Sequence, residues 1–188
     1  LLSLLPANIP IMGGLAGDDF QFKQTLTLAG ECLASSQVVA IGLYGQALTI
    51  SHGSRGGWLP FGPKRTITGA QGHVLLSLDY EPALEVYKSY LGDLVDNLPG
   101  SGLRYPLEIE EEGKPTRLVR TMLAVDEDQG SITFAGDIPL GATARFMRAN
   151  VESIIDGAAD AAEVAIKQHS APELAILISC VGRKELLR

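Results

Sequence analysis

The order of hydrophobic and polar residues predicts strands through most of the chain up to Asp79. TLTLAG (25–30) alternates between apolar and polar positions, as a strand with one covered face does. VVAIGLYG (38–45) is continuously apolar and rich in β-branched residues, which favours a strand covered on both faces. ALTISH (47–52) follows almost at once, so residues 44–47 are predicted to form a tight hairpin turn.

A second pair of alternating segments, RTIT (65–68) and HVLLSLD (73–79), is separated by a short glycine-containing turn. Between the first pair of strands and this one lies SRGGWLPFGPKR (54–65), which is dense in glycine and proline. Because both residue types interrupt regular secondary structure, this segment is predicted to be a loop.

Two segments have the spacing of amphipathic helices. Residues 82–98 carry apolar side chains three and four positions apart, Pro82 suits a first helical turn, and LPGSG (98–102) ends the pattern. A second helix is predicted from about residue 143 to 168, with Thr143 as its N-cap. Gly157 inside this helix is expected to permit close packing. The apolar face of the second helix is expected to contain Met147, Val151, Ile154, Ile155, Ala158, Ala162 and Ala165.

Strands return between and after the helices. YPLEI (105–109) is short, and its proline predicts an edge strand. RLVRTMLAV (117–125) and SITFAG (131–136) flank a polar loop that ends in glycine, so they are predicted to form a hairpin. ELAILISCV (173–181) has the composition of a buried strand, and GRKELLR (182–188) begins another turn or helix.

This order of elements predicts an α+β fold. Many strands are followed by one helix, three strands, a long helix and a last strand, which is not the strand–helix alternation of a doubly wound sheet. We therefore expect a layered architecture of largely antiparallel sheets with two main helices packed on them.

Composition and charge argue against some classes of function and location. The formal net charge is −7 and the pI about 4.9, so a nucleic-acid-binding face is not expected. Two cysteines cannot form a disulfide scaffold, and they favour a reducing compartment such as the cytoplasm. The first apolar run is too short to cross a bilayer and lacks a basic start, so neither a signal peptide nor a membrane helix is predicted. The chain begins with Leu1 and ends in mid-element, so we expect a fragment of a longer protein.

Few residues suggest chemistry on their own. Asp18 and Asp19 follow a glycine-rich turn and could act as paired carboxylates, although an ordinary turn is the simpler interpretation. Trp58 lies in GGWLPFGP, either in a packed loop or in the wall of a ligand pocket. Of the three histidines, none has metal-ligand spacing, and His52 is the one most suggestive of a site because it ends a predicted strand beside a loop.

Two arginines and one cysteine complete the candidate residues. Arg117 and Arg120 lie three apart on a predicted strand and therefore face opposite sides, and an inward-facing arginine needs a carboxylate or a ligand. SCVGR places Cys180 and Arg183 where a predicted buried strand ends. No histidine is adjacent in the sequence to activate Cys180, so a buried structural cysteine is favoured over a nucleophile. No catalytic or phosphate-binding motif is present, and we do not expect an enzyme.

Several motifs, taken in their order and spacing, resemble the FIST domain family. The run LD-x-x-PAL-x-x-Y-x-x-x-L and the terminal SC-x-GR are specific in combination, and the resemblance extends over almost the whole chain. The motifs are GGLAGDD, VVAIGLYG, GGWLPFGP, LDYEPALEVYKSYLG, YPLEI, RLVRTMLAVDEDQGSITFAGDIPLG and ISCVGR.

The resemblance implies a division into two parts. Residues 1–81 would be the C-terminal portion of the FIST N-part, and residues 82–188 the FIST C-part, truncated at its end. The family is regarded as a sensory domain of prokaryotic signalling proteins that binds small, amino-acid-like molecules without catalysis. Some members are described as haem-binding nitric-oxide sensors that regulate a histidine kinase, and a eukaryotic relative accompanies an F-box.

The leading hypothesis is thus a cytoplasmic bacterial sensor domain that binds a small molecule and signals to a partner such as a histidine kinase or cyclase. A zwitterion needs a carboxylate for its amine, a cation for its carboxylate and a dry wall. The alternatives are a haem-based sensor, with His52 as axial ligand, and a protein-interaction domain. A sheet that lacks strands could also pair with a neighbouring copy in a homo-oligomer. The candidate ligand-binding residues are Asp18, Asp19, Trp58, Arg120, Cys180 and Arg183.

Overall fold

The computed structural model divides the chain into two compact units, which are described separately. The smaller unit comprises Leu1–Leu48 and Pro172–Val181, and the larger unit comprises Thr49–Ala171 and Gly182–Arg188. The residues described by the structure are 6, 9–19, 21, 23–114, 117–168 and 171–188.

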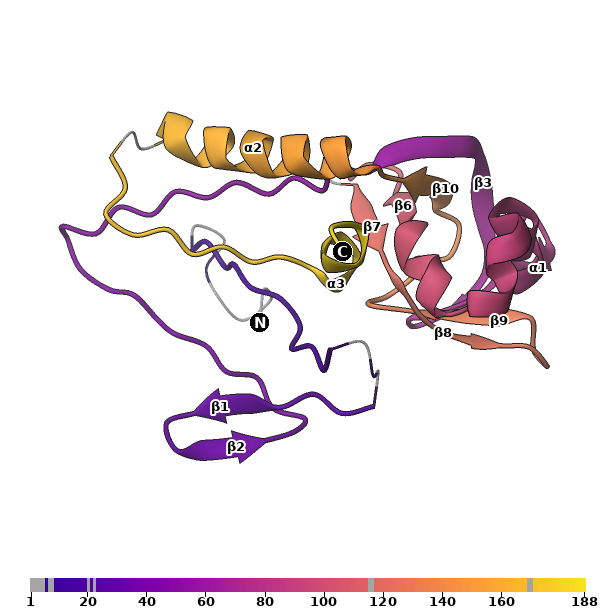
Figure 1. The fold of residues 1–188 in the computed structure, drawn as a ribbon, viewed down its shortest axis with the longest axis horizontal. Coiled ribbons are helices and arrows are strands. Elements are labelled where there is room, and N and C mark those ends of the chain that lie inside the picture. The colour runs from indigo at the N-terminus through magenta and orange to yellow at the C-terminus, as the bar shows by residue number, and fades with distance from the viewer. Residues whose placement is uncertain (1–5, 7–8, 20, 22, 115–116, 169–170) are drawn as a thin grey trace. The chain divides into compact units, whose positions relative to one another are not determined.

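The larger unit is built on an eight-stranded antiparallel sheet (Figure 1). Its order is β7-β6-β10-β3-β4-β9-β8, and β5 pairs with β4 beside this path. Helices complete the unit, so the expected α+β class with antiparallel sheets and packed helices is confirmed. The strands are β3 (Leu59–Gln71), β4 (Val74–Leu78), β5 (Glu81–Pro82), β6 (Leu107–Glu110), β7 (Leu118–Arg120), β8 (Met122–Asp126), β9 (Ser131–Phe134) and β10 (Thr143–Arg148).

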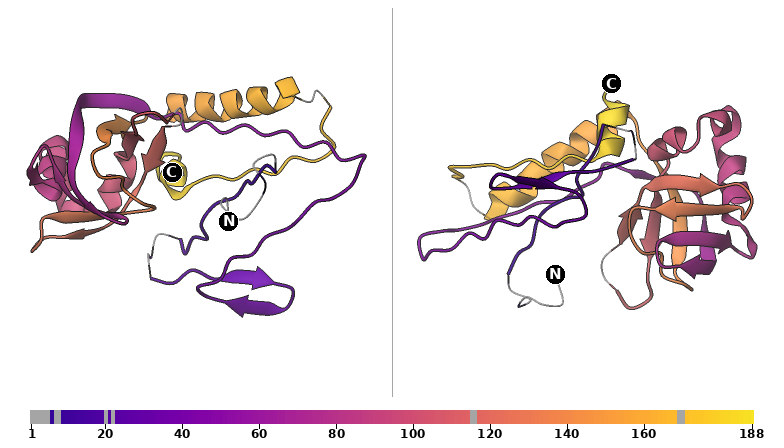
Figure 2. Two further views of the ribbon diagram at one scale, coloured as in Figure 1. Left: turned by 180° about the vertical axis from the view of Figure 1, so that it is seen from behind. Right: turned by 90° about the horizontal axis from the view of Figure 1, so that it is seen from below.

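The 13-residue strand β3 bends and belongs to both halves of the sheet, as Figures 1 and 2 show. It pairs with β10 on one side and with β4 on the other. The prediction of a loop over residues 54–65 was therefore wrong for its second half. Gly62 and Pro63 lie in a bulge, where the register of β3 against β10 shifts between Arg145 and Phe146. The bulge allows a strand to contain these residues, and the Gly62 φ of 74° suits glycine.

The first predicted helix is shorter than expected. It forms α1 (Ala83–Leu91), followed by the 3-10 helices η1 (Gly92–Asn97) and η2 (Gly100–Arg104). The α-helix ends at Gly92, whose φ of 53° favours glycine. The apolar stripe of α1 faces the core as predicted, because Leu84, Tyr87 and Leu91 are buried against the sheet.

The core of the larger unit contains an aromatic cluster. The Tyr87 ring meets Phe146 edge-on with centroids 4.6 Å apart, and Tyr90 stacks on Phe146 at 4.3 Å. The Tyr87 hydroxyl donates a hydrogen bond to the Tyr105 carbonyl oxygen, so this buried polar group is paired. The surrounding buried aliphatic residues are Ile67, Leu75, Leu78, Leu84, Leu107, Ile109, Met122, Ile132 and Ile138.

Two strand predictions in the middle of the chain need correction. Residues 105–109 were expected at an edge, yet β6 lies between β7 and β10, because Pro106 precedes the strand and removes no ladder hydrogen bond. Residues 117–125 were expected as one strand, but the chain changes partner at Thr121. The first part, β7, pairs with β6, and the second part, β8, forms the predicted hairpin with β9.

The second predicted helix begins later than expected. Residues 143–148 form β10, so Thr143 is not its N-cap, and the helix is α2 (Val151–Gln168). Asn150 begins α2 instead: its side-chain oxygen accepts from the Ser153 amide at 2.8 Å, and the Ser153 hydroxyl accepts from the Asn150 amide at 3.1 Å. Ladder bonds to β3 and β6 on both sides outweigh the helical pattern there. Ile154 is buried as expected, whereas Val151 and Ile155 are exposed.

The smaller unit contains one short hairpin, β1 (Thr27–Ala29) with β2 (Cys32–Ala34). The strands predicted at 38–45, 47–52 and 173–181 do not form, because no other described segment supplies a ladder partner; residues 49–52 belong to the larger unit. Of the hairpin turn expected at 44–47, a turn at 46–47 is present. The apolar pattern predicted that these segments are covered but did not identify the covering segments. Their exposed apolar residues are Val38, Val39, Ile41, Leu43, Tyr44, Leu48, Ile50, Leu174, Ile176, Leu177 and Ile178.

The last element, α3 (Val181–Leu186), confirms the helical alternative for the C-terminal segment. Within the described residues, none of the helices combines the length and the apolar character that crossing a membrane requires.

We expect Tyr87→Ala to destabilise the larger unit by about 3–5 kcal/mol, because it empties the centre of the aromatic cluster. Tyr87→Phe keeps the ring and leaves the Tyr105 carbonyl without its donor, at a cost of about 1–3 kcal/mol. Urea unfolding measures both, with Tyr80→Phe as control, since Tyr80 is 89% exposed. Equal stability of Tyr87→Ala and the control would contradict this packing.

Burial raises the pKa of the Tyr87 hydroxyl above its ordinary value. An unfolded tyrosine loses its proton near pH 10 (about its reference value), whereas folded Tyr87 keeps it. Unfolding above that pH therefore releases a proton, and the free energy of unfolding falls as the pH rises. Thermal unfolding between pH 8 and 11 (roughly bracketing that value) should show a steeper alkaline loss for the wild type than for Tyr87→Phe, and parallel curves would contradict it.

Candidate functional site

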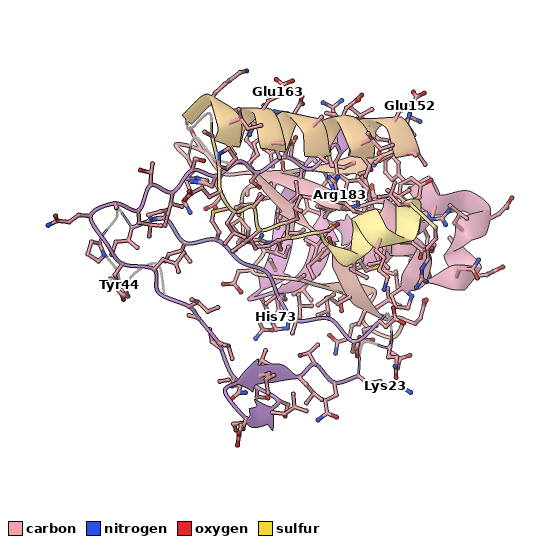
Figure 3. The ribbon with its side chains drawn as sticks, turned by 60° about the vertical axis from the view of Figure 1, so that its left-hand side comes forward. Lys23, Tyr44, His73, Glu152, Glu163 and Arg183 are labelled. Atoms are coloured by element: carbon pink, nitrogen blue, oxygen red, sulfur yellow. The ribbon has the colours of Figure 1, made fainter. Side chains whose placement is uncertain are left out.

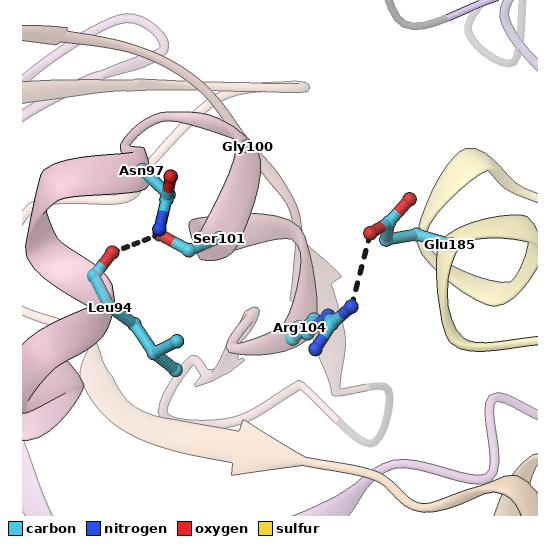
Figure 4. A pocket seen from close by; sticks show the side chains of 6 residues that line it. All are labelled: Leu94, Asn97, Gly100, Ser101, Arg104 and Glu185. Carbon is cyan, nitrogen blue, oxygen red and sulfur yellow. Dashed lines mark hydrogen bonds and ion pairs between the residues drawn. The ribbon is translucent and has the colours of Figure 1, made fainter. Parts of the chain in front are cut away.

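A hollow of about 330 Å³ lies on the larger unit, between the two 3-10 helices and α3 (Figure 4). Its lining is mostly polar and includes one cation and one carboxylate. The lining residues are Leu94, Asn97, Gly100, Ser101, Arg104 and Glu185.

The local sequence fixes one wall of this hollow. The Ser101 hydroxyl donates to the Leu94 carbonyl at 2.7 Å, which ties η2 to η1. Gly102 is buried so tightly that an added Cβ would collide with the Met122 sulfur on β8. A side chain at position 102 would have to displace Met122, so the glycine lets η2 lie close against β8, with Ser101 and Arg104 lining the hollow.

The charged pair in the hollow joins η2 to α3. Arg104 Nη2 lies 3.2 Å from Glu185 Oε1, and Arg188 Nη1 is 3.9 Å from the other Glu185 oxygen. The Arg104 side chain is 47% exposed and that of Glu185 26%. A guanidinium and a carboxylate thus stand side by side in a site open to solvent, with the Asn97 amide and the Ser101 hydroxyl nearby (Figure 4).

The helix α3 that carries Glu185 is packed closely against the unit. Gly182 is buried, and an added Cβ would lie 3.2 Å from the Leu103 carbonyl oxygen and 3.3 Å from the Trp58 ring. Since a side chain at position 182 would push these neighbours apart by a few tenths of an ångström, the glycine lets the backbone of α3 rest closely on η2 and on Trp58. The tryptophan therefore serves here as a packing surface for α3.

Arg183 fastens α3 to two other segments (Figure 3). Its Nη1 donates to the Gly56 carbonyl at 3.1 Å, and its Nη2 donates to the Ile154 carbonyl in α2 at 2.6 Å. These two segments touch each other, because a Cβ on Gly157 would lie 2.6 Å from the Gly57 amide nitrogen. The expectation that Gly157 permits close packing is thus confirmed.

The other candidate ligand-binding residues from the sequence make separate contacts. Arg120 donates from Nε to the Asp137 carbonyl at 3.1 Å, beside Gly136. Asp18 lies in the smaller unit, and its carboxylate accepts from the Lys23 and Gln24 amides at 2.7 and 3.1 Å, which closes a local loop of the chain.

Asp19, with a φ of 58°, and Cys180, which is exposed, also belong to the smaller unit. The larger unit thus brings Trp58 and Arg183 together through α3. Asp18, Asp19 and Cys180 are in a different unit, and Arg120 contacts the segment at residues 136–137 that follows β9.

His52, the candidate axial ligand for haem, is exposed. Neither the hollow at Arg104 nor a second one in the smaller unit, lined by Lys23, Gln24, Thr25, Ser35 and Ser36, includes a histidine. Among the residues that the structure describes, no three or more His, Cys, Asp or Glu side chains are grouped so that they could hold a metal ion.

Sequence reasoning did not single out the hollow. Its two charged residues are 81 positions apart, and LPGSG was interpreted only as the end of a helix. The available signal was the pair of glycines at 100 and 102 beside a serine and an arginine, which is typical of a tight turn that presents polar side chains.

Comparisons with known proteins place the chain in a family. A model described as the FIST N domain matches residues 1–81, and one described as the FIST C domain matches residues 83–188. A search of curated proteins and a search of solved structures each gave no match. The two matches together extend over nearly the whole chain and confirm the resemblance seen in the motifs. The chain therefore belongs to the FIST family, whose domains are sensory domains of signal transduction.

Proposed function

We propose that this protein is a sensory domain that binds a small, amino-acid-like molecule in the hollow between η1, η2 and α3. The observation that carries the proposal is the Arg104 guanidinium, 3.2 Å from the Glu185 carboxylate, in a hollow of about 330 Å³. That volume lies at the lower end of the range of about 300–1,000 Å³ found for small-molecule sites.

The residues of the hollow match the groups of an α-amino acid. The planar guanidinium of Arg104 can hold a carboxylate through two parallel hydrogen bonds, and Glu185 can accept from an ammonium group. The Asn97 amide and the Ser101 hydroxyl add orienting hydrogen bonds, and Leu94 supplies an apolar wall.

The existing ion pair is a weak competitor for such a ligand. Exposed pairs of this kind contribute about 0.2–1 kcal/mol, because water already solvates both charges. A zwitterion that pairs with both residues replaces one ion pair with two, so it is expected to separate Arg104 from Glu185 at low cost.

Among the residues expected from the sequence, we assign Trp58 and Arg183 to holding α3 in place, since their contacts are with backbone and with a glycine. Asp18, Asp19, Arg120 and Cys180 do not line the hollow, so the proposal that they bind a ligand concerns a site other than the hollow. We further propose that the protein acts in the cytoplasm of a bacterium by binding and not by catalysis, and that it signals to a histidine kinase or cyclase.

A thermal-shift panel of amino acids, small carboxylates and haem tests this function. A ligand at a hundred times its dissociation constant stabilises by about 2.7 kcal/mol, which raises the melting temperature by several degrees in a protein of this size. Titration calorimetry on Glu185→Gln and Arg104→Gln should then show an affinity at least tenfold lower, because each variant removes one of the two charges.

Glu127→Gln is the matched control, because it also breaks a surface ion pair, to Lys88 at 2.6 Å, outside the hollow. Unchanged affinity in both hollow variants would contradict the site. A shift with haem alone, with a Soret band that His52→Ala removes, would favour the haem sensor instead.

A protein-interaction domain is the second candidate function, and the exposed apolar residues of the smaller unit favour it. Ile41 is 86% exposed and Leu177 93% exposed, each within a run of apolar residues. Soluble monomers seldom leave such runs in water, and unpaired extended segments can add a strand to another chain.

Self-association of the chain through these apolar segments would be direct evidence for an interaction domain. We expect multi-angle light scattering to show a molar mass that rises with protein concentration, because the apolar segments of two copies cover each other. Ile41→Lys should lower that mass, and Tyr80→Lys, at an exposed site in the larger unit, should leave it unchanged. A mass independent of concentration and of Ile41→Lys would contradict association through this segment.

A further inference from the structure

We propose that Arg183 is a positioning residue that couples the hollow to α2, so that occupancy of the hollow alters how α2 is held. This inference rests on the proposed function in one respect, namely that the hollow is a ligand site. The coupling itself depends only on contacts among α3, η2, Trp58 and α2.

The short helix α3 carries both residues through which the coupling acts, Glu185 and Arg183. On α3, Glu185 faces Arg104 of η2, and Arg183, two residues earlier, donates to Gly56 and to Ile154 of α2. Since α3 has only six residues, it has little capacity to bend, and a shift of one contact moves the other.

The packing beneath α3 is tight. A Cβ added at Gly182 would lie 3.2 Å from the Leu103 carbonyl oxygen and 3.3 Å from the Trp58 ring, so these neighbours would have to move by a few tenths of an ångström to admit it. Close-packed interfaces transmit small displacements because they cannot absorb them. A displacement of Glu185 by a ligand is therefore passed to Arg183 and to the ring of Trp58.

The Arg183 contact is suited to change. It places a cation beside the first turn of α2, where the helix dipole disfavours positive charge. Two hydrogen bonds to backbone carbonyls hold it there, and both must be made together for the guanidinium to bridge the two segments. Loss of either bond removes the link that Arg183 makes between Gly56 and Ile154 and leaves the direct contact of Gly57 with α2 as the remaining restraint.

A ligand shifts this equilibrium only if it prefers one arrangement. An amino acid inserted between Arg104 and Glu185 requires a wider gap than the 3.2 Å of the direct pair. It therefore favours the arrangement in which α3 has moved from η2. By reciprocity, a partner that binds α2 in the released state would raise the affinity of the hollow for its ligand.

The coupling can be tested first without a ligand, because Trp58 is the sole tryptophan of the chain and reports on α3. In the full chain, Glu185→Gln and Arg104→Gln break the pair from opposite sides. Both should shift the Trp58 emission to longer wavelength and speed amide hydrogen exchange in residues 151–157. Glu127→Gln should change neither, and circular dichroism confirms that each variant is folded.

Arg183→Lys tests the positioning role itself. A lysine retains the charge but cannot bridge two carbonyls as the fork does, so exchange in residues 151–157 should rise to the level of Glu185→Gln. Adding Glu185→Gln to Arg183→Lys should produce no further rise. Additive effects, or no effect of Glu185→Gln on α2, would overturn the coupling.

L-alanine serves as the probe for the ligand arm, with calorimetry and Trp58 emission recorded on the same samples. Binding with an emission shift that Arg183→Lys abolishes is the expected result. Binding without an emission shift would overturn the coupling and leave the proposed site intact. Failure of L-alanine and of the amino-acid panel to bind would overturn the proposed site, while the ligand-free variants still decide the coupling.

Discussion

The sharing of β3 between two hydrogen-bonded ladders is the interaction on which the rest of the larger unit depends. Pairing with β10 satisfies one edge of the strand, and pairing with β4 satisfies the other. The bulge at Gly62 and Pro63 and the register shifts near Gly69 let one strand bend between the two halves of the sheet. The aromatic cluster around Tyr87 fills the space that this curvature encloses.

Close backbone approaches extend this framework to the candidate site. Gly102 seats η2 on β8, Gly182 seats α3 on η2, and Gly157 admits the glycines at 56 and 57 to the surface of α2. The Gly157 contact is between backbones, whereas Gly102 lies against the Met122 side chain and Gly182 against the Leu103 carbonyl and the Trp58 ring. Polar side chains line the hollow, where the Arg104 guanidinium and the Glu185 carboxylate form an ion pair.

In the proposed site, a ligand would replace the surface ion pair of Arg104 and Glu185 with its own bonds. The helix α3, which carries Glu185, is short and closely packed, so a shift at one of its contacts is expected to affect the others. The fork of Arg183 connects that helix to α2, so a local exchange of partners has a route to an exposed helix.

The sequence by itself determined the α+β class, the amphipathic face of α1, the hairpin of β8 with β9, and membership of the FIST family. These features depend on residues close together in the chain or on motifs in fixed order. Only the tertiary structure decided that residues 143–148 are a strand, that the strands predicted over 38–52 and 173–181 lack a partner among the described residues, and that Arg104 meets Glu185. A strand requires hydrogen bonds to a partner strand, and a site requires side chains from distant segments. The spacing of apolar residues along the chain contains neither kind of information.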